Sequence, residues 1–258
     1  MADTGSPAPC PDLLRQRLVS GTPTFLMAVR AWPMAEAVHL AAVTGHHGIY
    51  IDMQHGAIGI ETASQLCLVA VALRLPALVR VPVMDPALIG AVLDNGAAGV
   101  MVPDVDDVET ARRALASSRH PPAGNRSVAA PRAFATQARP FMALMIETPR
   151  GVAAAASIAA LADVDALVVG TGDLAANLEE KDTLNTHIAA VVAAGRAHGV
   201  PVILAGLRDS AAARRATDAG AAACFIVGTD MAYLMDGARR QVGTFQDVFS
   251  LASQTHPD

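Results

Sequence analysis

Short apolar runs alternate with helix-like stretches along most of this chain. A recurring order is a helical stretch, a glycine and a β-branched run, as in "ALIGAVLDNGAAGVMVP" (87–103). Gly45, Gly96, Gly199 and Gly220 occupy the position where a helix commonly ends in a left-handed residue. The runs that follow are apolar at successive positions, which is typical of parallel strands covered by helices. The pattern therefore predicts a repeated βα unit.

The chain contains eight such units within 258 residues. This number and length favour a (β/α)8 TIM barrel over an open doubly wound sheet, and no G-x-G-x-x-G motif opens the first unit. We expect one domain over residues 1–258, with a polar, Pro-rich N-terminal segment (1–18) and a polar tail (248–258). The expected strands lie at about 24–29, 48–53, 77–82, 99–102, 142–146, 165–169, 201–205 and 223–227.

Composition narrows the functional classes. The chain is 52% hydrophobic but only 3% aromatic, so its large core must be aliphatic. A net charge of −5 offers no basic surface for nucleic acid. The N-terminal segment lacks the apolar centre of an export signal, and the Ala-rich stretch 151–162 is too short to span a bilayer. We therefore expect a cytoplasmic protein that acts on small molecules, without nucleic-acid or membrane partners.

Polar residues follow two neighbouring predicted strands, at the end where such barrels carry their active sites. In "YIDMQHGAIG" (50–59), an apolar run leads directly into Asp52, Gln54 and His55. The next strand carries Arg80 in "ALVRVP", and this guanidinium requires a carboxylate from the protein or from a ligand. From position alone, the favoured interpretation of His55 is a satisfied histidine at the edge of the barrel mouth.

Two acids end later strands. Glu147 and Asp173 follow apolar runs in "LMIETPRG" and "VVGTGDLA", and a buried carboxylate requires a partner. A divalent cation is one candidate, because two carboxylates supply hard oxygen ligands and leave positions for water and a chelating substrate. Alternatively, Glu147 pairs with Arg80 or Arg150 and Asp173 caps the next helix. We expect Asp104, after the fourth strand, to lie in the N-terminal cap region of the following helix.

Several of these stretches together resemble one family. "IDMQHG", "ALVRVP", "LDNGAAGVMVP", "PPAGNRS", "MIETPRGV" and "VVGTGDLA" are similar in order and spacing to the HpcH/HpaI aldolases, which are metal-dependent pyruvate aldolases. The resemblance covers roughly residues 20–247. It implies a TIM barrel whose last helix is exchanged between subunits, commonly in a hexamer.

The resemblance also implies roles for individual residues. The expected metal ligands are Glu147 and Asp173, for Mg²⁺, Mn²⁺ or Co²⁺. The expected catalytic residues are His55 as the base, Arg80 as the substrate-binding arginine, Asp52 as the preceding acid, and Asp94 as the acid that orients His55, within the chain or across a subunit interface. The expected substrate contacts, beside Arg80, are Gly172, Asp173 and Gln54.

The sequence departs from the family pattern in three places. Gln54 stands where many members have Glu, and Met145 stands where many have Gln. The irregular stretch 119–141 is shorter than expected. These departures bear on the aldehyde specificity and on the contacts between subunits, while the proposed metal ligands and base are retained.

The implied reaction is reversible cleavage of a 4-hydroxy-2-oxo acid to pyruvate and an aldehyde. The single lysine, Lys181, lies in a polar segment, which argues against a Schiff-base mechanism. Two alternatives stay open. A CoA-thioester lyase of the citrate lyase type would need a basic patch, for which we expect little beyond Arg126, Arg132 and Arg139. A non-catalytic 2-oxo acid binding protein is the other.

Overall fold

The computed structural model describes residues 10–128, 138–180, 183–207 and 209–254. Its eight strands form one parallel sheet in the order β7-β6-β5-β4-β3-β2-β1-β8. Across the seam between the two ends of this order, the Ala222 amide donates to the Val202 carbonyl (2.7 Å), so the barrel is nearly closed. The strands are β1 (Thr24–Val29), β2 (Gly48–Asp52), β3 (Ala77–Arg80), β4 (Gly99–Val102), β5 (Phe141–Ile146), β6 (Ala166–Gly170), β7 (Val202–Ala205) and β8 (Cys224–Thr229).

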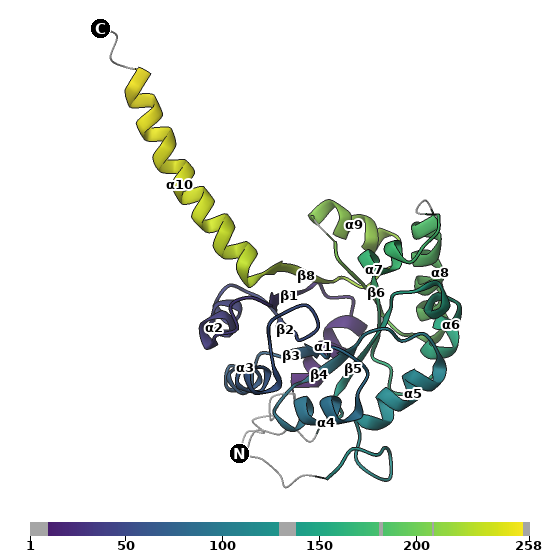
Figure 1. Cartoon of the computed structure of the whole chain (residues 1–258). Helices are drawn as coiled ribbons and strands as arrows, with labels where there is room; N and C mark the ends of the chain where they lie inside the picture. The colour runs from purple at the N-terminus through teal and green to yellow at the C-terminus, as the bar shows by residue number, and fades with distance from the viewer. Residues whose placement is uncertain (1–9, 129–137, 181–182, 208, 255–258) are drawn as a thin grey trace, which may run out of the picture.

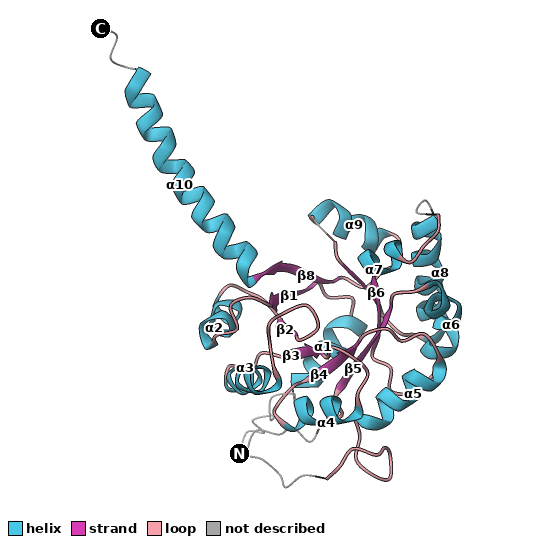
Figure 2. Ribbon diagram, in the orientation of Figure 1, coloured by secondary structure: helices cyan, strands magenta, loops and turns pink. Residues whose placement is uncertain are grey.

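Helices surround the barrel and return the chain to the start of each next strand (Figures 1 and 2). The predicted glycines Gly45, Gly96, Gly199 and Gly220 all have positive φ values, which confirms their place after helix ends. The helices are α1 (Cys10–Val19), α2 (Ala35–Val43), α3 (Ile60–Ala72), α4 (Pro86–Asp94), α5 (Val108–Ser117), α6 (Pro149–Ala159), α7 (Thr171–Ala176), α8 (Leu184–His198), α9 (Ser210–Asp218) and α10 (Asp230–Gln254).

Strand alternation divides the core into two layers. One set of side chains packs between the strands and the surrounding helices, and it includes Val29, Ile51 and Val79. The other set fills the barrel interior, because successive side chains of a strand point to opposite faces. The interior set comprises Leu26, Ala28, Tyr50, Leu78, Met101, Phe141, Ala143, Met145, Ala166, Val168, Ile203 and Cys224, together with Leu14 and Leu18 of α1.

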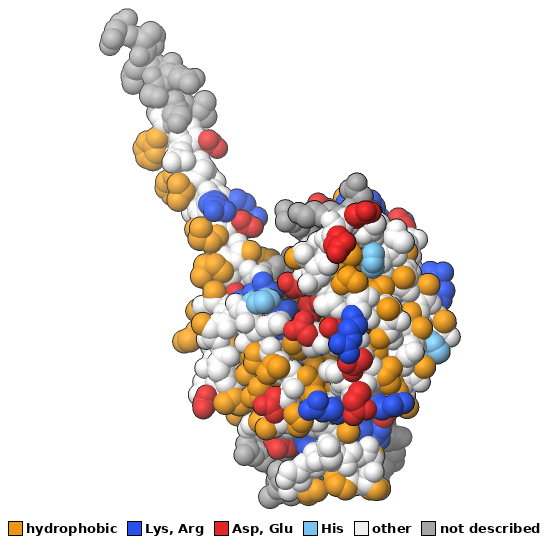
Figure 3. All heavy atoms as spheres, turned by 45° about the vertical axis from the view of Figure 1, so that its right-hand side comes forward, with side chains coloured by type: hydrophobic (Ala, Val, Ile, Leu, Met, Phe, Trp, Pro, Cys, Tyr) orange, Lys and Arg blue, Asp and Glu red, His pale blue; other side chains and the backbone are white. Residues whose placement is uncertain are grey.

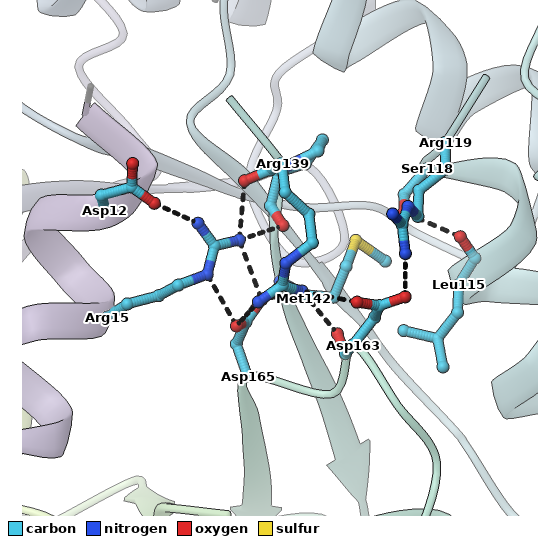
Figure 4. A network of polar contacts seen from close by, with 10 residues as sticks. Asp12, Arg15, Leu115, Ser118, Arg119, Arg139, Met142, Asp163 and Asp165 are labelled. Atoms are coloured by element: carbon cyan, nitrogen blue, oxygen red, sulfur yellow. Dashed lines mark hydrogen bonds and ion pairs between the residues drawn. The ribbon is translucent and has the colours of Figure 1, made fainter. Parts of the chain in front are cut away.

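Helix α1 closes the amino-terminal end of the barrel. Arg15 donates to Asp165 (Nε to Oδ1, 2.8 Å) and to the carbonyl oxygen of Arg139 (2.7 Å), just before β6 and β5. Arg139 pairs with Asp165 and Asp163 in turn, and Figure 4 shows that these side chains form one network. Because the floor of the barrel is occupied in this way, the carboxyl ends of the strands are the open end.

Helix α10 projects from the barrel instead of lying against it (Figure 1). Figure 3 shows apolar side chains along one side of this helix, and Val242, Phe245, Val248 and Phe249 are more than half exposed. The helix continues to Gln254, so the predicted polar tail (248–258) is helical over residues 248–254. None of the helices in the described part of the chain has the length and apolar character needed to cross a membrane.

Candidate active site

A charged layer lies above the apolar interior at the carboxyl ends of four strands. Ala28, Tyr50, Leu78 and Met145 all belong to the interior set. Two positions further along each strand, the same face of the chain presents an ionisable residue, because side chains repeat every second position. These residues are Arg30 after β1, Asp52 at the end of β2, Arg80 at the end of β3 and Glu147 after β5.

Asp52 is the centre of this layer. It is directly opposite Arg80 in the register of β2 and β3. Arg80 donates from Nε to Oδ1 (2.9 Å) and from Nη2 to Oδ2 (2.7 Å), and both residues are buried. Hydrogen bonds and charge from Arg80 outweigh the effect of burial and hold the pKa of Asp52 below its usual value. Asp52 is therefore ionised and holds Arg80 in place. The carboxylate partner of Arg80 is thus a residue of the protein.

The carboxylate of Asp52 also shapes the turn after β2. The backbone amides of Gln54 and His55 both donate to Oδ1 (3.1 Å each). The His55 side chain is exposed at this end of the barrel. The Gln54 Oε1 atom is buried, and it has no hydrogen-bond partner within the described residues. The structure thus brings Asp52, Gln54, His55 and Arg80 together, as the sequence predicts.

Arg30 is a site residue that the sequence analysis missed. Its Nε lies 2.7 Å from Asp52 Oδ2, on the carboxylate that Arg80 also binds. The signal was present in the chain: Leu26 and Ala28 point inward, so position 30 continues the inward face just beyond the end of the strand. A charged residue at that position of a barrel strand belongs to the active-site end.

Glu147 is 2% exposed at the end of β5. Among the described residues it has no ion-pair partner, because Arg80 binds Asp52 and Arg150 binds Asp107 (2.6 Å). Both predicted pairings of Glu147 are therefore wrong. Burial raises the pKa of Glu147, and the nearby charges of Asp104 and Asp173 raise it further. A hydrogen bond from the Asp104 amide and the charge of Arg80 lower it, but the net shift is upward.

Asp104, Glu147 and Asp173 form an acidic group at the carboxyl ends of the strands. Asp104 is therefore not part of the cap of the following helix. The cap of α5 is Asp107, whose side chain accepts from the Thr110 amide (2.8 Å). Asp104 has a positive φ of 53°, and its amide donates to Glu147 Oε2 (3.1 Å). The prediction that placed Asp104 in the cap region is wrong, because a left-handed residue turns the chain toward β5 before the helix begins.

Gly170 and α7 complete the acidic side of the site. A Cβ atom at Gly170 would lie 2.3 Å from Glu147 Oε1, so only glycine leaves room for that carboxylate at the end of β6. Gly172 and Asp173 follow in the first turn of α7, where backbone amides lack partners within the helix. Asp173 is the third residue of α7, whose N-cap is Gly170 without a side-chain hydrogen bond, so the alternative in which Asp173 caps this helix is wrong. Asp173 is close enough to Glu147 to influence its pKa.

The donor set of this acidic group fits a divalent cation. Glu147 and Asp173 offer hard oxygen atoms, and Glu147 is buried without an ion-pair partner among the described residues. In the described residues, no group of three or more His, Cys, Asp or Glu is arranged to hold a metal. A cation bound by two carboxylates would therefore take its remaining ligands from water and substrate.

Asp94, the predicted orienting acid, lies at the other end of the barrel in this chain. It is the last residue of α4, and it pairs with Arg126 (Nη2 to Oδ1, 2.5 Å). Helices of a βα barrel end near the amino ends of the strands, so Asp94 is far from the His55 turn within one subunit. A role for Asp94 beside His55 remains a prediction that requires a second subunit.

Two of the arginines expected at the mouth are also at the amino-terminal end. Arg126 is bound to Asp94, and Arg139 is bound to Asp163 and Asp165. Placing them at the mouth was therefore wrong, because the stretch 119–141 joins the end of α5 to the start of β5. Arg132 lies outside the described residues, and so does Lys181.

The fold and the site together point to a class of protein: a βα barrel that carries an acidic group and an arginine–carboxylate pair at the carboxyl ends of its strands. Residues 33–236 match the family model described as HpcH/HpaI aldolase/citrate lyase. The chain belongs to this family, which confirms the resemblance and the predicted class of carbon–carbon lyase.

Relatives of known activity support the assignment along most of the chain. A hydroxypyruvate/pyruvate aldolase of Delftia acidovorans is 34% identical over 81% of this chain and 84% of its own length. A 4-hydroxy-2-oxo-heptane-1,7-dioate aldolase of Salmonella paratyphi B is 30% identical over 81% and 85%. The crystal structure of a family member from Burkholderia cenocepacia is 30% identical, covers 90% of this chain and 98% of its own, and gives a TM-score of 0.81.

Proposed function

We propose that this protein is a divalent-metal-dependent aldolase that reversibly cleaves a 4-hydroxy-2-oxo acid to pyruvate and an aldehyde. The observation that carries the proposal is the buried Glu147, which has no ion-pair partner among the described residues and lies within electrostatic reach of the Asp52–Arg80 pair. Acidic ligands and an anchored arginine are the groups that bind a 2-oxo acid and stabilise an enolate.

Glu147 and Asp173 would hold the cation, with Mg²⁺, Mn²⁺ and Co²⁺ as the ions suited to oxygen ligands. When bound, it supplies electrophilic stabilisation for the negative charge that develops on the 2-oxo oxygen. The amides of Gly172 and Asp173, in the first turn of α7, would receive the pyruvyl carboxylate, because helix amino ends favour anions.

The remaining steps belong to the arginine and the histidine. Arg80, fixed by Asp52, donates to the enolate oxygen as charge develops there. His55 takes the proton of the C4 hydroxyl, the C3–C4 bond breaks, and the aldehyde leaves. The pyruvate enolate then gains a proton at C3. Gln54, next to His55 in the turn, contacts the substrate through its amide.

For His55→Ala we expect kcat to fall by about 10²–10⁴-fold, the usual range for a positioned general base. The pH profile of kcat should also change, because the proposed general base is removed. Steady-state kinetics over pH measures both effects. If kcat and the pH profile stay close to the wild type while thermal stability falls, His55 only packs at the mouth.

Pyruvate release from a panel of 4-hydroxy-2-oxo acids tests the proposed function directly. We expect turnover with at least one member, a fall of about a hundredfold or more after chelator treatment, and recovery with Mg²⁺, Mn²⁺ or Co²⁺. Full activity in a metal-free sample would contradict the metal-dependent mechanism. Binding of pyruvate without any turnover would instead favour a 2-oxo acid binding protein.

The citrate lyase alternative finds less support in the site. An acyl-CoA substrate would need cations for its phosphate groups, and two of the arginines considered for that role, Arg126 and Arg139, are engaged in ion pairs at the opposite end of the barrel. Cleavage of a CoA thioester, measured with the same metal ions, would overturn the aldolase proposal.

The proposal extends to a homo-oligomer in which α10 is exchanged between subunits, with a hexamer as the expected assembly. Helix α10 leaves its own barrel (Figure 1), and Phe245 is 58% exposed. A cavity of about 470 Å³ lies between β8 and α9, where Phe225, Ile226 and Leu207 form part of its lining. In such an assembly, Asp94 of one subunit would lie close to His55 of another only if the two subunits pack in a suitable orientation. Light scattering of the protein in solution gives the mass that tests it.

A further inference from the structure

Arg30 places a second guanidinium at the carboxyl end of the barrel. It is the first residue after β1, and its Nε lies 2.7 Å from Asp52 Oδ2. The side chain is 39% exposed, whereas the Arg80 side chain on the same carboxylate is 5% exposed. The Arg30 side chain is therefore held by Asp52 on one side and remains accessible to solvent at the barrel mouth on the other.

The two arginines are unequally engaged. Arg80 makes two well-directed hydrogen bonds to Asp52, one to each oxygen. Arg30 is close to Oδ2, but within the described part of the chain its buried Nε makes no hydrogen bond of suitable geometry. One carboxylate thus faces two guanidinium groups, and Arg80 takes both of its well-directed hydrogen bonds. A ligand carboxylate would give the Arg30 guanidinium a charge-assisted partner of its own.

The backbone of Arg30 is held from two sides. The amides of Arg30, Ala31 and Trp32 donate to Oδ2 of Asp230, at distances of 3.0, 2.9 and 2.6 Å. Asp230 is 1% exposed and begins α10. On the other side, a Cβ at Gly56 would lie 3.2 Å from the Cα of Arg30, so the turn after β2 packs directly on this backbone.

A fixed backbone under a partly exposed guanidinium is a preorganised anion-binding element, because little freedom is lost when a ligand binds. Arg30 and Arg80 also flank the same carboxylate. A substrate whose pyruvyl half contacts Arg80 therefore extends next to Arg30. An arginine suits a carboxylate particularly well, since its planar donors match both oxygens.

We propose that Arg30 binds a carboxylate group on the aldehyde half of the substrate, so that the enzyme prefers aldehydes bearing a carboxylate over neutral ones. This inference rests on the proposed aldolase function and specifies its substrate class. It goes beyond the reaction itself, because the roles proposed for Arg80, His55 and the acidic group do not depend on which aldehyde is used.

The test compares aldehydes matched in length in the condensation with pyruvate: glyoxylate with glycolaldehyde, and succinic semialdehyde with butanal. The measured quantity is the ratio of kcat/KM for the charged aldehyde to that for its neutral partner. In the wild type we expect a ratio well above one for at least one pair. In Arg30→Gln it should fall by about 10–100-fold, mostly through KM, as for a lost hydrogen bond to a charged group.

Arg150→Gln is the matched control, because it removes a positive charge that binds Asp107 at the same end of the barrel without contacting Asp52. Its ratio should stay within about twofold of the wild type, as expected for a weak exposed pair. Arg30→Lys should retain part of the preference, since it keeps the charge and loses the planar donors. Thermal unfolding confirms that each variant is folded.

The outcomes separate this inference from the proposed function. Deuterium exchange at C3 of pyruvate, followed by NMR, reports enolate formation without any aldehyde. If the wild type exchanges these protons but shows no preference for charged aldehydes, the Arg30 inference is overturned alone. An equal loss with charged and neutral aldehydes in Arg30→Gln also overturns it, because Arg30 would then serve only as a counter-ion for Asp52. If the wild type neither exchanges nor condenses, the proposed function fails as well.

Discussion

Asp52→Asn is expected to lower the free energy of unfolding by about 3–5 kcal/mol and kcat/KM by about 10³-fold or more. The substitution keeps the shape of the side chain but removes the charge that compensates the buried Arg80. An asparagine amide would also direct donor hydrogens toward donors of Arg80 or Arg30. The cost is large because a buried guanidinium without its counter-ion remains in a poorly solvated site.

The loss of activity has two sources. Arg80 would no longer be fixed toward the enolate, and the amides of Gln54 and His55 would share a weaker acceptor. Chemical denaturation and steady-state kinetics measure the two effects. Asp218→Asn is a suitable control, since Asp218 pairs with Arg214 on an exposed helix and should change little.

A double variant sharpens this result. If the buried pair explains the cost, removing Arg80 as well by Arg80→Gln should recover part of the lost stability, because no unpaired cation remains. Activity should not recover, since the arginine itself acts on the substrate. If the stability loss of the double variant equals the sum of the losses of the two single variants, Asp52 and Arg80 are not coupled in the way their geometry indicates.

Glu147→Gln is expected to reduce kcat/KM by about 10³–10⁵-fold, because a neutral amide is a weak ligand and the electrophilic stabilisation of several kcal/mol would be lost. The same substitution should make the metal-free protein more stable at neutral pH. Burial and neighbouring carboxylates raise the pKa of Glu147, so its ionised form is disfavoured in the fold. Glutamine has nearly the same shape and carries no charge.

The sign of the pH dependence follows from this raised pKa. The folded state holds the proton more tightly than the unfolded state, so the contribution of Glu147 to stability is present at low pH. It is lost as the pH rises through the folded-state pKa. The stability gain of Glu147→Gln should therefore grow from acidic to neutral pH, as thermal unfolding of metal-free samples would measure. A variant that is less stable than the metal-free wild type at neutral pH would contradict this account.

Much of the fold could be predicted because its determinants are local. A glycine at a helix end, such as Gly96 or Gly199, depends on the conformation of one residue, and an apolar run of strand length depends on a few neighbours. The position of the active-site end follows from chain direction, which is why Asp52, Arg80 and Glu147 were placed at the carboxyl ends of strands. Strand parity would have added Arg30 to this set.

The pairing of these groups could not be predicted in the same way. Whether Arg80 binds Asp52 or Glu147 depends on which strand ends are neighbours in the barrel and on their register, which places Asp52 opposite Arg80. Likewise, Asp104 reaches Glu147 only because one left-handed residue redirects the chain.

The sequence by itself determined the repeated βα unit, the barrel and the residue types at its open end, because hydrophobic periodicity and chain direction act over a few residues. The tertiary structure decided the partners. It gave Asp52 two arginines, left Glu147 without an ion-pair partner among the described residues, and directed α10 away from the barrel. It also placed Asp94 at the opposite end of its own subunit. Ion pairs and helix packing depend on distances between segments far apart in the chain, which local patterns do not specify.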